Sequence, residues 1–192
     1  MKRPAIHVER LIDMTVAFGR TRNHLLFLNG NETHPKVNVL LGMTQSKVYG
    51  PLFFGEATVT RTVYIDMLEN SSNLDFLQMA FLTQYGAPCH YAIIVHDYLD
   101  RLFLGRRISR GGTQPWAARS LDLTQLGFFA WGFIKSTVHT GRGTGDLTEL
   151  RNRIIDAVQK ITPKMLEYVF RETIYRFELF RDTDGRHVET NK

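Results

Sequence analysis

Cysteine is almost absent from this chain, which contains one, Cys89, among 192 residues. A single cysteine cannot form an intrachain disulfide, and such usage is typical of proteins in a reducing compartment. Residues 1–4 carry charge, but no apolar stretch follows them, so we expect no secretory signal. We therefore expect a location in the nucleus or the cytoplasm, and we do not expect secretion.

Long hydrophobic runs are also missing. The longest apolar stretch, residues 123–134, is interrupted by Thr124, Gln125, Gly127 and Gly132. It falls short of the roughly 18 residues that a membrane helix needs, so we expect no membrane partner. Charge of either sign is modest, with a net charge of +5. That excess fits a polyanion such as nucleic acid without requiring one.

The first half of the chain predicts strands. Short apolar runs occur at residues 25–28, 37–41, 52–54 and 76–82. Asn29-Gly30, Gly42 and Gly50-Pro51 bound the first three with turn chemistry. Asn29-Gly30 predicts a hairpin that joins the first two strands.

Helical spacing dominates later. Apolar residues recur every three or four positions in residues 62–70, 91–102 and 123–138, which predicts three helices. Residues 105–112, Gly-Arg-Arg-Ile-Ser-Arg-Gly-Gly, predict a basic loop, and residues 141–145 predict an interhelical linker. Asp146 and Glu149 form a capping box, and Thr162-Pro163 predicts another helix start.

The predicted elements begin with strands, continue with alternating strands and helices, and end with helices. This order indicates an α/β domain with a helical C-terminal layer. We expect an N-terminal strand region at residues 1–32, the main domain at residues 33–182, and a polar tail at residues 183–192.

Three segments are more specific than composition. The first consists of residues 36–39, KVNV, residues 47–54, KVYGPLFF, residues 56–60, EATVT, and residues 64–70, YIDMLEN. The second, residues 84–91, reads QYGAPCHY, and the third, residues 116–132, reads WAARSLDLTQLGFFAWG. In this order, and together with Asp146 to Ile154 and the residues around Thr162-Pro163, they resemble the catalytic domain of mariner-type transposases of arthropods. The N-terminal helix-turn-helix domains with which that family reads DNA have no counterpart in these residues.

The resemblance implies a ribonuclease H-like mixed sheet flanked by helices, DNA as the partner, and a possible homodimer. Members of the family hold two divalent cations, usually magnesium, with three carboxylates, and cut DNA by in-line phosphodiester displacement. Magnesium prefers oxygen ligands, so all three positions need carboxylates.

The chain departs from this pattern at the acids. The second acid belongs directly after Gln84, where the sequence has Tyr85, and the third belongs before Phe128, where it has Gly127. Neither residue replaces a carboxylate as a magnesium ligand. Asp13 is the best candidate for the first acid, although its spacing and flanking residues fit the family poorly.

We therefore expect a catalytically inactive transposase-derived domain that needs no cofactor and retains DNA binding. Phosphate contacts by arginine need no metal. The candidate DNA-contacting residues are Arg106, Arg107, Arg110, Arg119 and His90.

Two other functions stay open. One is an interaction or structural module without a nucleic-acid role, which would present an apolar patch. The other is an active nuclease with relocated acids, for which the nearby suppliers are Asp13, Asp97, Asp100 and Asp122. Zinc binding by Cys89, His90 and His96 lacks a second ligand pair at suitable spacing, which favours an ordinary loop and helix surface.

Overall fold

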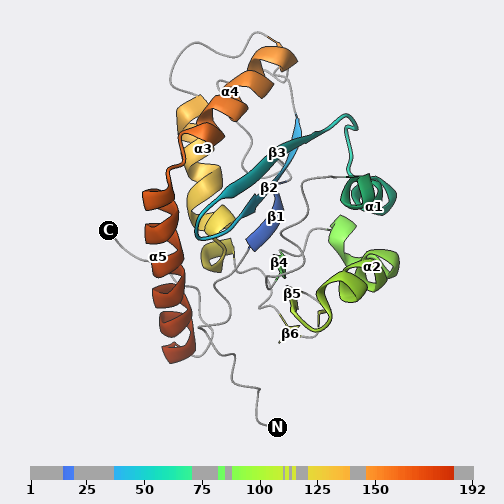
Figure 1. Cartoon of the computed structure of the whole chain (residues 1–192), viewed down its shortest axis with the longest axis vertical. Coiled ribbons are helices and arrows are strands. Elements are labelled where there is room, and N and C mark those ends of the chain that lie inside the picture. Colours follow the sequence, from blue (N-terminus) through green and yellow to red (C-terminus); the bar gives the residue numbers. More distant parts are fainter. Residues whose placement is uncertain are drawn as a thin grey trace.

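The computed structural model of the chain describes residues 15–19, 37–70, 82–84, 88–109, 111–112, 114–115, 121–138 and 146–183. Six strands form one mixed sheet in the order β3-β2-β1-β4-β5-β6 (Figure 1). Their bounds are β1 Thr15–Gly19, β2 Asn38–Met43, β3 Val48–Phe54, β4 Leu82–Gln84, β5 Arg107–Ser109 and β6 Gln114–Pro115. The first three strands are antiparallel neighbours, whereas β1, β4, β5 and β6 run parallel.

Helices cover both faces of the sheet (Figure 1). One layer holds α1 Arg61–Asn70, the 3-10 turn η3 Pro88–Tyr91 and α2 Ile93–Phe103. The other holds the π-helical turn η5 Leu126–Ala130, α3 Trp131–Val138, α4 Leu147–Gln159 and α5 Pro163–Asp182. A short 3-10 turn, η4 Leu121–Leu123, precedes η5. None of the described helices is long and apolar enough to cross a membrane.

Strand β2 shows why the sheet needs two helical layers. Val39, Leu41 and Met43 pack into the core with α3, α4 and α5, while Leu40 packs with α1 and α2. Successive side chains of a strand point to opposite faces, so the consecutive apolar residues at 39–41 require a cover on each side. The continuous apolar run in the sequence is the cause of this arrangement.

Most predicted elements are confirmed. Strand β2 covers the run predicted at residues 37–41, and α1 and α2 match the helices predicted at residues 62–70 and 91–102. Both predicted caps are present as well. Asp146 Oδ1 accepts a hydrogen bond from the Glu149 N–H at 2.7 Å, and Thr162 Oγ1 accepts one from the Met165 N–H at 3.3 Å.

The prediction of a turn at Gly50-Pro51 is wrong, because both residues lie inside β3. Gly50 has φ +97°, and a Cβ there would stand 2.8 Å from the Leu40 carbonyl oxygen. Glycine therefore allows a close approach between β2 and β3, where the register shifts between Leu40 and Gly42. Proline is tolerated because β3 lies at the edge of the described sheet.

Two other predicted elements are divided. Residues 105–112 are not one loop, because β5 occupies Arg107–Ser109. Residues 123–138 are not one regular helix either, since the π-helical turn η5 precedes α3. Thr124 Oγ1 accepts a hydrogen bond from the Gly127 N–H at 3.0 Å, which gives the helical segment its start at this threonine.

Several predictions fall outside the described residues: the strand at residues 25–28, the Asn29-Gly30 turn and the linker at residues 141–145. The antiparallel partner of β2 on the β1 side is Thr15–Gly19. This strand comes from the segment 1–32 that the sequence sets apart, yet it lies in the middle of the sheet. At least this part of the segment belongs to the same sheet as the rest.

The cap of α4 gives a stability prediction. Asp146→Ala removes the acceptor for the Glu149 N–H and should lower the free energy of unfolding by about 1 kcal/mol. Asp146→Asn keeps an acceptor oxygen and should lose much less. Urea denaturation of the three proteins measures the difference, and equal losses in the two variants would show that the side-chain bond does not stabilise the helix.

Candidate functional site

Three elements meet where the sequence predicts the acids. Strand β1 pairs in parallel with β4, and Val16 is the partner of Gln84, the last residue of β4. The turn η5, which holds Gly127, contacts β1. The strand end before Tyr85 and the helical turn with Gly127 are therefore both neighbours of the central strand.

The residues at this junction do not fit a pair of divalent cations. Strand β1 reads TVAFG and contains no carboxylate. Gly127 is half-buried and has no side chain. Tyr85 and Asp13 lie outside the described residues: Tyr85 follows Gln84 in the sequence, and Asp13 precedes the first residue of β1 by two positions. Magnesium sites need several oxygen ligands, and neither β1 nor η5 supplies an acidic one.

Uncharged polar groups fill the interior at the end of β4. Gln84 Nε2 donates a hydrogen bond to the Tyr64 hydroxyl at 2.6 Å, and both side chains are buried. The Tyr64 ring lies 4.5 Å from the His90 ring, centroid to centroid. Burial raises the pKa of the Tyr64 hydroxyl well above its ordinary range, Cys89 adds to the rise, and the Gln84 hydrogen bond opposes it. The Tyr64 phenol is therefore neutral at pH 7.

The burial of His90 corrects its prediction as a phosphate contact. Only 4% of the residue is exposed, because its ring packs against Tyr64 beneath the surface. A phosphate group could reach it only after the surrounding core opened.

The other acids do not assemble a replacement site. Asp97 lies exposed on α2, Asp100 pairs with an arginine, and Asp122 lies in η4, where its carbonyl accepts a hydrogen bond from Arg176. Among the described residues, no group of three or more His, Cys, Asp or Glu side chains could hold a metal ion. This statement covers Cys89 and His96 as well as these three aspartates.

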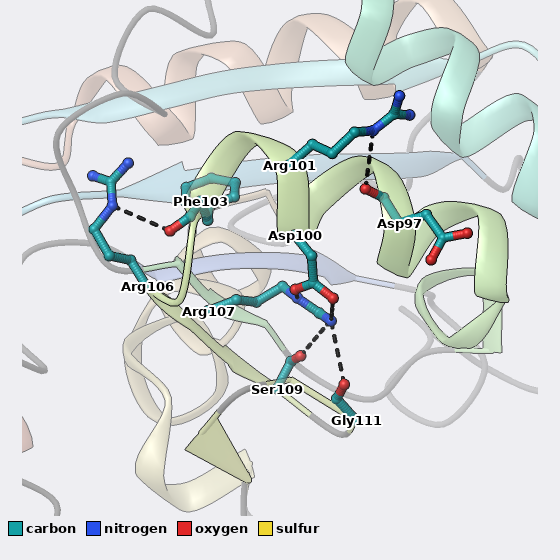
Figure 2. A network of polar contacts seen from close by, with 8 residues as sticks. All are labelled: Asp97, Asp100, Arg101, Phe103, Arg106, Arg107, Ser109 and Gly111. Carbon is teal, nitrogen blue, oxygen red and sulfur yellow. Dashed lines mark hydrogen bonds and ion pairs between the residues drawn. The ribbon is translucent and has the colours of Figure 1, made fainter.

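Arg107 is the principal correction among the basic residues. The sequence predicts it as an exposed DNA contact, but its side chain is fully buried. Its Nε and Nη2 donate to the Asp100 carboxylate at 2.7 and 2.9 Å, its Nη1 donates to Ser109 Oγ, and its Nη2 also donates to the Gly111 carbonyl (Figure 2). A buried charge needs such partners, and here they join α2 to β5 and to the turn after it.

Strand β5 also fixes the position of Arg106. Arg106 precedes the strand, and its carbonyl accepts a hydrogen bond from the N–H of Leu82, the first residue of β4. Ser109 ends the strand beside Gln84, the last residue of β4. Because β4 and β5 are parallel, Arg106 lies where these strands begin, at the other end from Gln84. Arg110 and Arg119 lie outside the described residues.

The turn after β5 packs tightly against α2. Gly111 has φ +78°, and a Cβ on it would stand 2.5 Å from His96 Cε1. Burial lowers the pKa of His96 below its ordinary value, and the Arg107 charge lowers it further. Asp100, a hydrogen bond to the His90 backbone and Asp97 oppose this shift.

The turn before β5 has an unusual backbone. Leu104 adopts φ 34° and ψ 63°, the left-handed conformation that glycine usually occupies after a helix. Its N–H donates to the Asp100 carbonyl at 3.0 Å, and 79% of the residue is exposed. A residue with a Cβ in this conformation costs roughly 1–2 kcal/mol.

Removing the buried guanidinium should destabilise the protein strongly. Arg107→Met keeps much of the buried volume but leaves Ser109 and the Gly111 carbonyl without their donor. We expect a loss of about 2–4 kcal/mol in the free energy of unfolding, because the deleted group has several buried partners. The matched variant Arg101→Met removes an exposed arginine from α2 and should change stability by less than about 0.5 kcal/mol. Similar losses in chemical denaturation would contradict the buried network.

The His96 environment predicts a loss of stability in acid. The pKa of His96 is lower in the folded chain than in the unfolded chain, so the unfolded chain binds its proton first as pH falls. The His96 contribution is therefore complete above about pH 6.5 and is lost progressively below it. The free energy of unfolding should fall more between pH 7.5 and 5.5 in the wild type than in His96→Gln. Parallel pH profiles for the two proteins would refute this role.

Comparison with known proteins gives a result only at the level of structure. No family model matches the sequence, and no curated protein matches it. The fold is similar to that of a chain in a pre-cleavage Mos1 transpososome, with 16% identity, a TM-score of 0.71, and coverage of 93% of this chain and 57% of that one. It is also similar to the Mos1 strand transfer complex, with 19% identity, a TM-score of 0.71, and coverage of 94% and 56%.

A third similar structure is that of the catalytic domain of Mos1 mariner transposase alone. It has 17% identity and a TM-score of 0.68, and the match covers 95% of this chain and 86% of that one. The chain thus spans a little over half of the transposase chains in the two assemblies and most of the separate catalytic domain. The predicted fold is confirmed: this protein has the ribonuclease H-like fold of the Mos1 mariner transposase catalytic domain.

Proposed function

We propose that this chain is a transposase-derived domain that binds DNA through its phosphates and does not cut it. The observation that carries the proposal is the pairing of a transposase fold with acid-free elements at the catalytic junction. Strand β1 contains no carboxylate, and η5 has Gly127 where the family has an acid. Structures of the Mos1 catalytic domain have been solved with Mn and with Mg, whereas the residues described here offer no comparable set of ligands.

DNA binding does not depend on those acids. Arginine binds phosphate by charge and hydrogen bonding, and the contact needs neither a metal nor a particular base. The net charge of +5 favours this partner. Arg106 is the candidate phosphate contact among the described residues. Arg110 and Arg119 lie outside them and stay predictions from the sequence. Arg107 and His90 are excluded from the proposed surface because both are buried.

An apolar surface favours a second candidate function, that of a protein-interaction module. Tyr91, the last residue of η3, and Ile93 and Ile94, at the start of α2, are 50%, 77% and 48% exposed. Clustered apolar side chains on a surface are typical of protein contacts. This module would lack salt-dependent affinity for DNA, which separates it from the first proposal.

A salt titration tests DNA binding. Each phosphate contact that is lost should lower the slope of log affinity against log salt by about 0.9. The double variant Arg106→Gln/Arg110→Gln should therefore show a shallower slope than the wild type on a duplex of random sequence. The matched control Lys164→Gln/Arg181→Gln removes the same charge from exposed positions on α5 and should keep the wild-type slope. Equal slopes in all three proteins would remove the proposed surface.

A cleavage assay tests the proposed inactivity. Supercoiled plasmid incubated with the purified chain and Mg²⁺ or Mn²⁺ should stay supercoiled, because the described residues offer no carboxylate set that could hold two cations. Cleavage that disappears in Asp13→Ala would overturn the proposal and establish an active site with relocated acids.

A further inference from the structure

The turn between α2 and β5 exposes an apolar side chain on a fixed backbone. Leu104 is the most exposed large hydrophobic residue that the structure describes, at 79%. Its left-handed conformation is held by the hydrogen bond from its N–H to the Asp100 carbonyl. Glycine would suit this backbone better, and the leucine gains no compensating burial. A strained residue without a packing role suggests a role in contact with a partner.

Two arginines flank this leucine. Arg101 Nε donates to the Asp97 carbonyl, and Arg106 Nε donates to the Phe103 carbonyl, each at 3.2 Å. Figure 2 shows both guanidinium groups directed away from the buried Arg107 network, one from α2 and one from the residue before β5. The segment therefore combines the projecting Leu104 side chain, with the partly exposed Leu102 two residues before it, and two arginines that lie three positions before and two positions after Leu104 in the chain.

This combination fits duplex DNA best. Proteins that bend DNA insert aliphatic side chains between base pairs from the minor groove, while arginines contact the adjacent sugar–phosphate backbone. Sites for single strands rely on aromatic stacking, and this turn presents no aromatic side chain. A membrane surface would engage a broad apolar face, but Tyr91, Ile93 and Ile94 lie at the opposite end of α2, about 15 Å away at 1.5 Å per residue.

We propose that the α2–β5 turn is a DNA-binding element in which Leu104 acts as a wedge between base pairs and Arg101 and Arg106 bind the flanking phosphates. The inference rests on the proposed DNA binding and names the form of nucleic acid and the residue that enters it. The surface lies where β4 and β5 begin, whereas the proposed former acid position is next to Gln84, where β4 ends. The two are therefore separate.

The buried network fixes the geometry of this turn. Asp100 bonds the Arg107 side chain through its carboxylate and the Leu104 N–H through its carbonyl. The same residue thus ties the last turn of α2 to β5 and to the wedge. Arg107 is a positioning residue for the turn and does not itself touch DNA.

The test uses the full chain and a duplex of about 30 base pairs with one 2-aminopurine beside a central TA step. Insertion unstacks the bases, so wild-type binding should raise 2-aminopurine fluorescence about twofold. Leu104→Asn keeps a residue that tolerates the left-handed backbone but has no apolar side chain. It should abolish the rise and weaken affinity about tenfold, while Leu104→Met should restore both.

Ile93→Ala is the matched control, since it removes an equally exposed apolar side chain from the other end of α2. It should leave the fluorescence and the affinity unchanged. Leu104→Gly should raise the Tm by a few degrees because it relieves the backbone, and should lose the fluorescence rise. Opposite effects on stability and binding would distinguish a contact residue from a structural one.

The two proposals fail separately. Absence of salt-dependent DNA binding by the wild type would overturn the proposed function and this inference with it. Wild-type DNA binding with the same fluorescence in Leu104→Asn would overturn the wedge alone. Leu104-dependent binding to anionic lipid vesicles, without an effect of Leu104→Asn on DNA, would also overturn it.

Discussion

The parallel pairing of β1 with β4 is the contact on which the rest of the structure depends. It joins the antiparallel strands β1–β3 to the parallel strands β4–β6, and it does so through two residue pairs, Thr15 with Thr83 and Val16 with Gln84. Parallel strands need long crossover connections, which here bring helices over the sheet. The same pairing places the end of β4 beside the strand that η5 contacts. The position of the candidate site and the integrity of the sheet therefore depend on the same pairing.

Neutral polar groups lie at the end of β4, on the side of the sheet that α1 and α2 cover. Clustered carboxylates repel one another without a cation, whereas Gln84 and Tyr64 bond each other and stay neutral. The buried charge of Arg107 is neutralised by Asp100, and the pair joins α2 to β5. Burial favours such arrangements because unpaired charges are costly away from water. The buried charge of Arg107 therefore acts in packing, and the proposed DNA binding depends on residues at the surface.

The sequence predicted the elements with strong local signals. The apolar run of β2, the spacing of α1 and α2, and the caps Asp146 and Thr162 all appear in the structure, because each depends on residues a few positions apart. The prediction was wrong at Gly50-Pro51 and at residues 105–112. In both places, contacts between distant residues decide the conformation: the close approach of Leu40 to Gly50, and the pairing of β5 with β4.

The sequence by itself determined the mariner-like motifs and the absence of acids at positions 85 and 127, since residue identity at a motif position needs no coordinates. Only the tertiary structure decided which polar residues are exposed. No pattern in the sequence distinguishes Arg107 from Arg106, or His90 from Tyr91, in exposure. In the structure, Arg107 and His90 are buried and the two neighbours are not. Exposure depends on which face of a strand or turn meets α2 and α1. Contacts between distant residues decide which face that is, so the sequence alone could not separate the buried members of the proposed binding surface from the exposed ones.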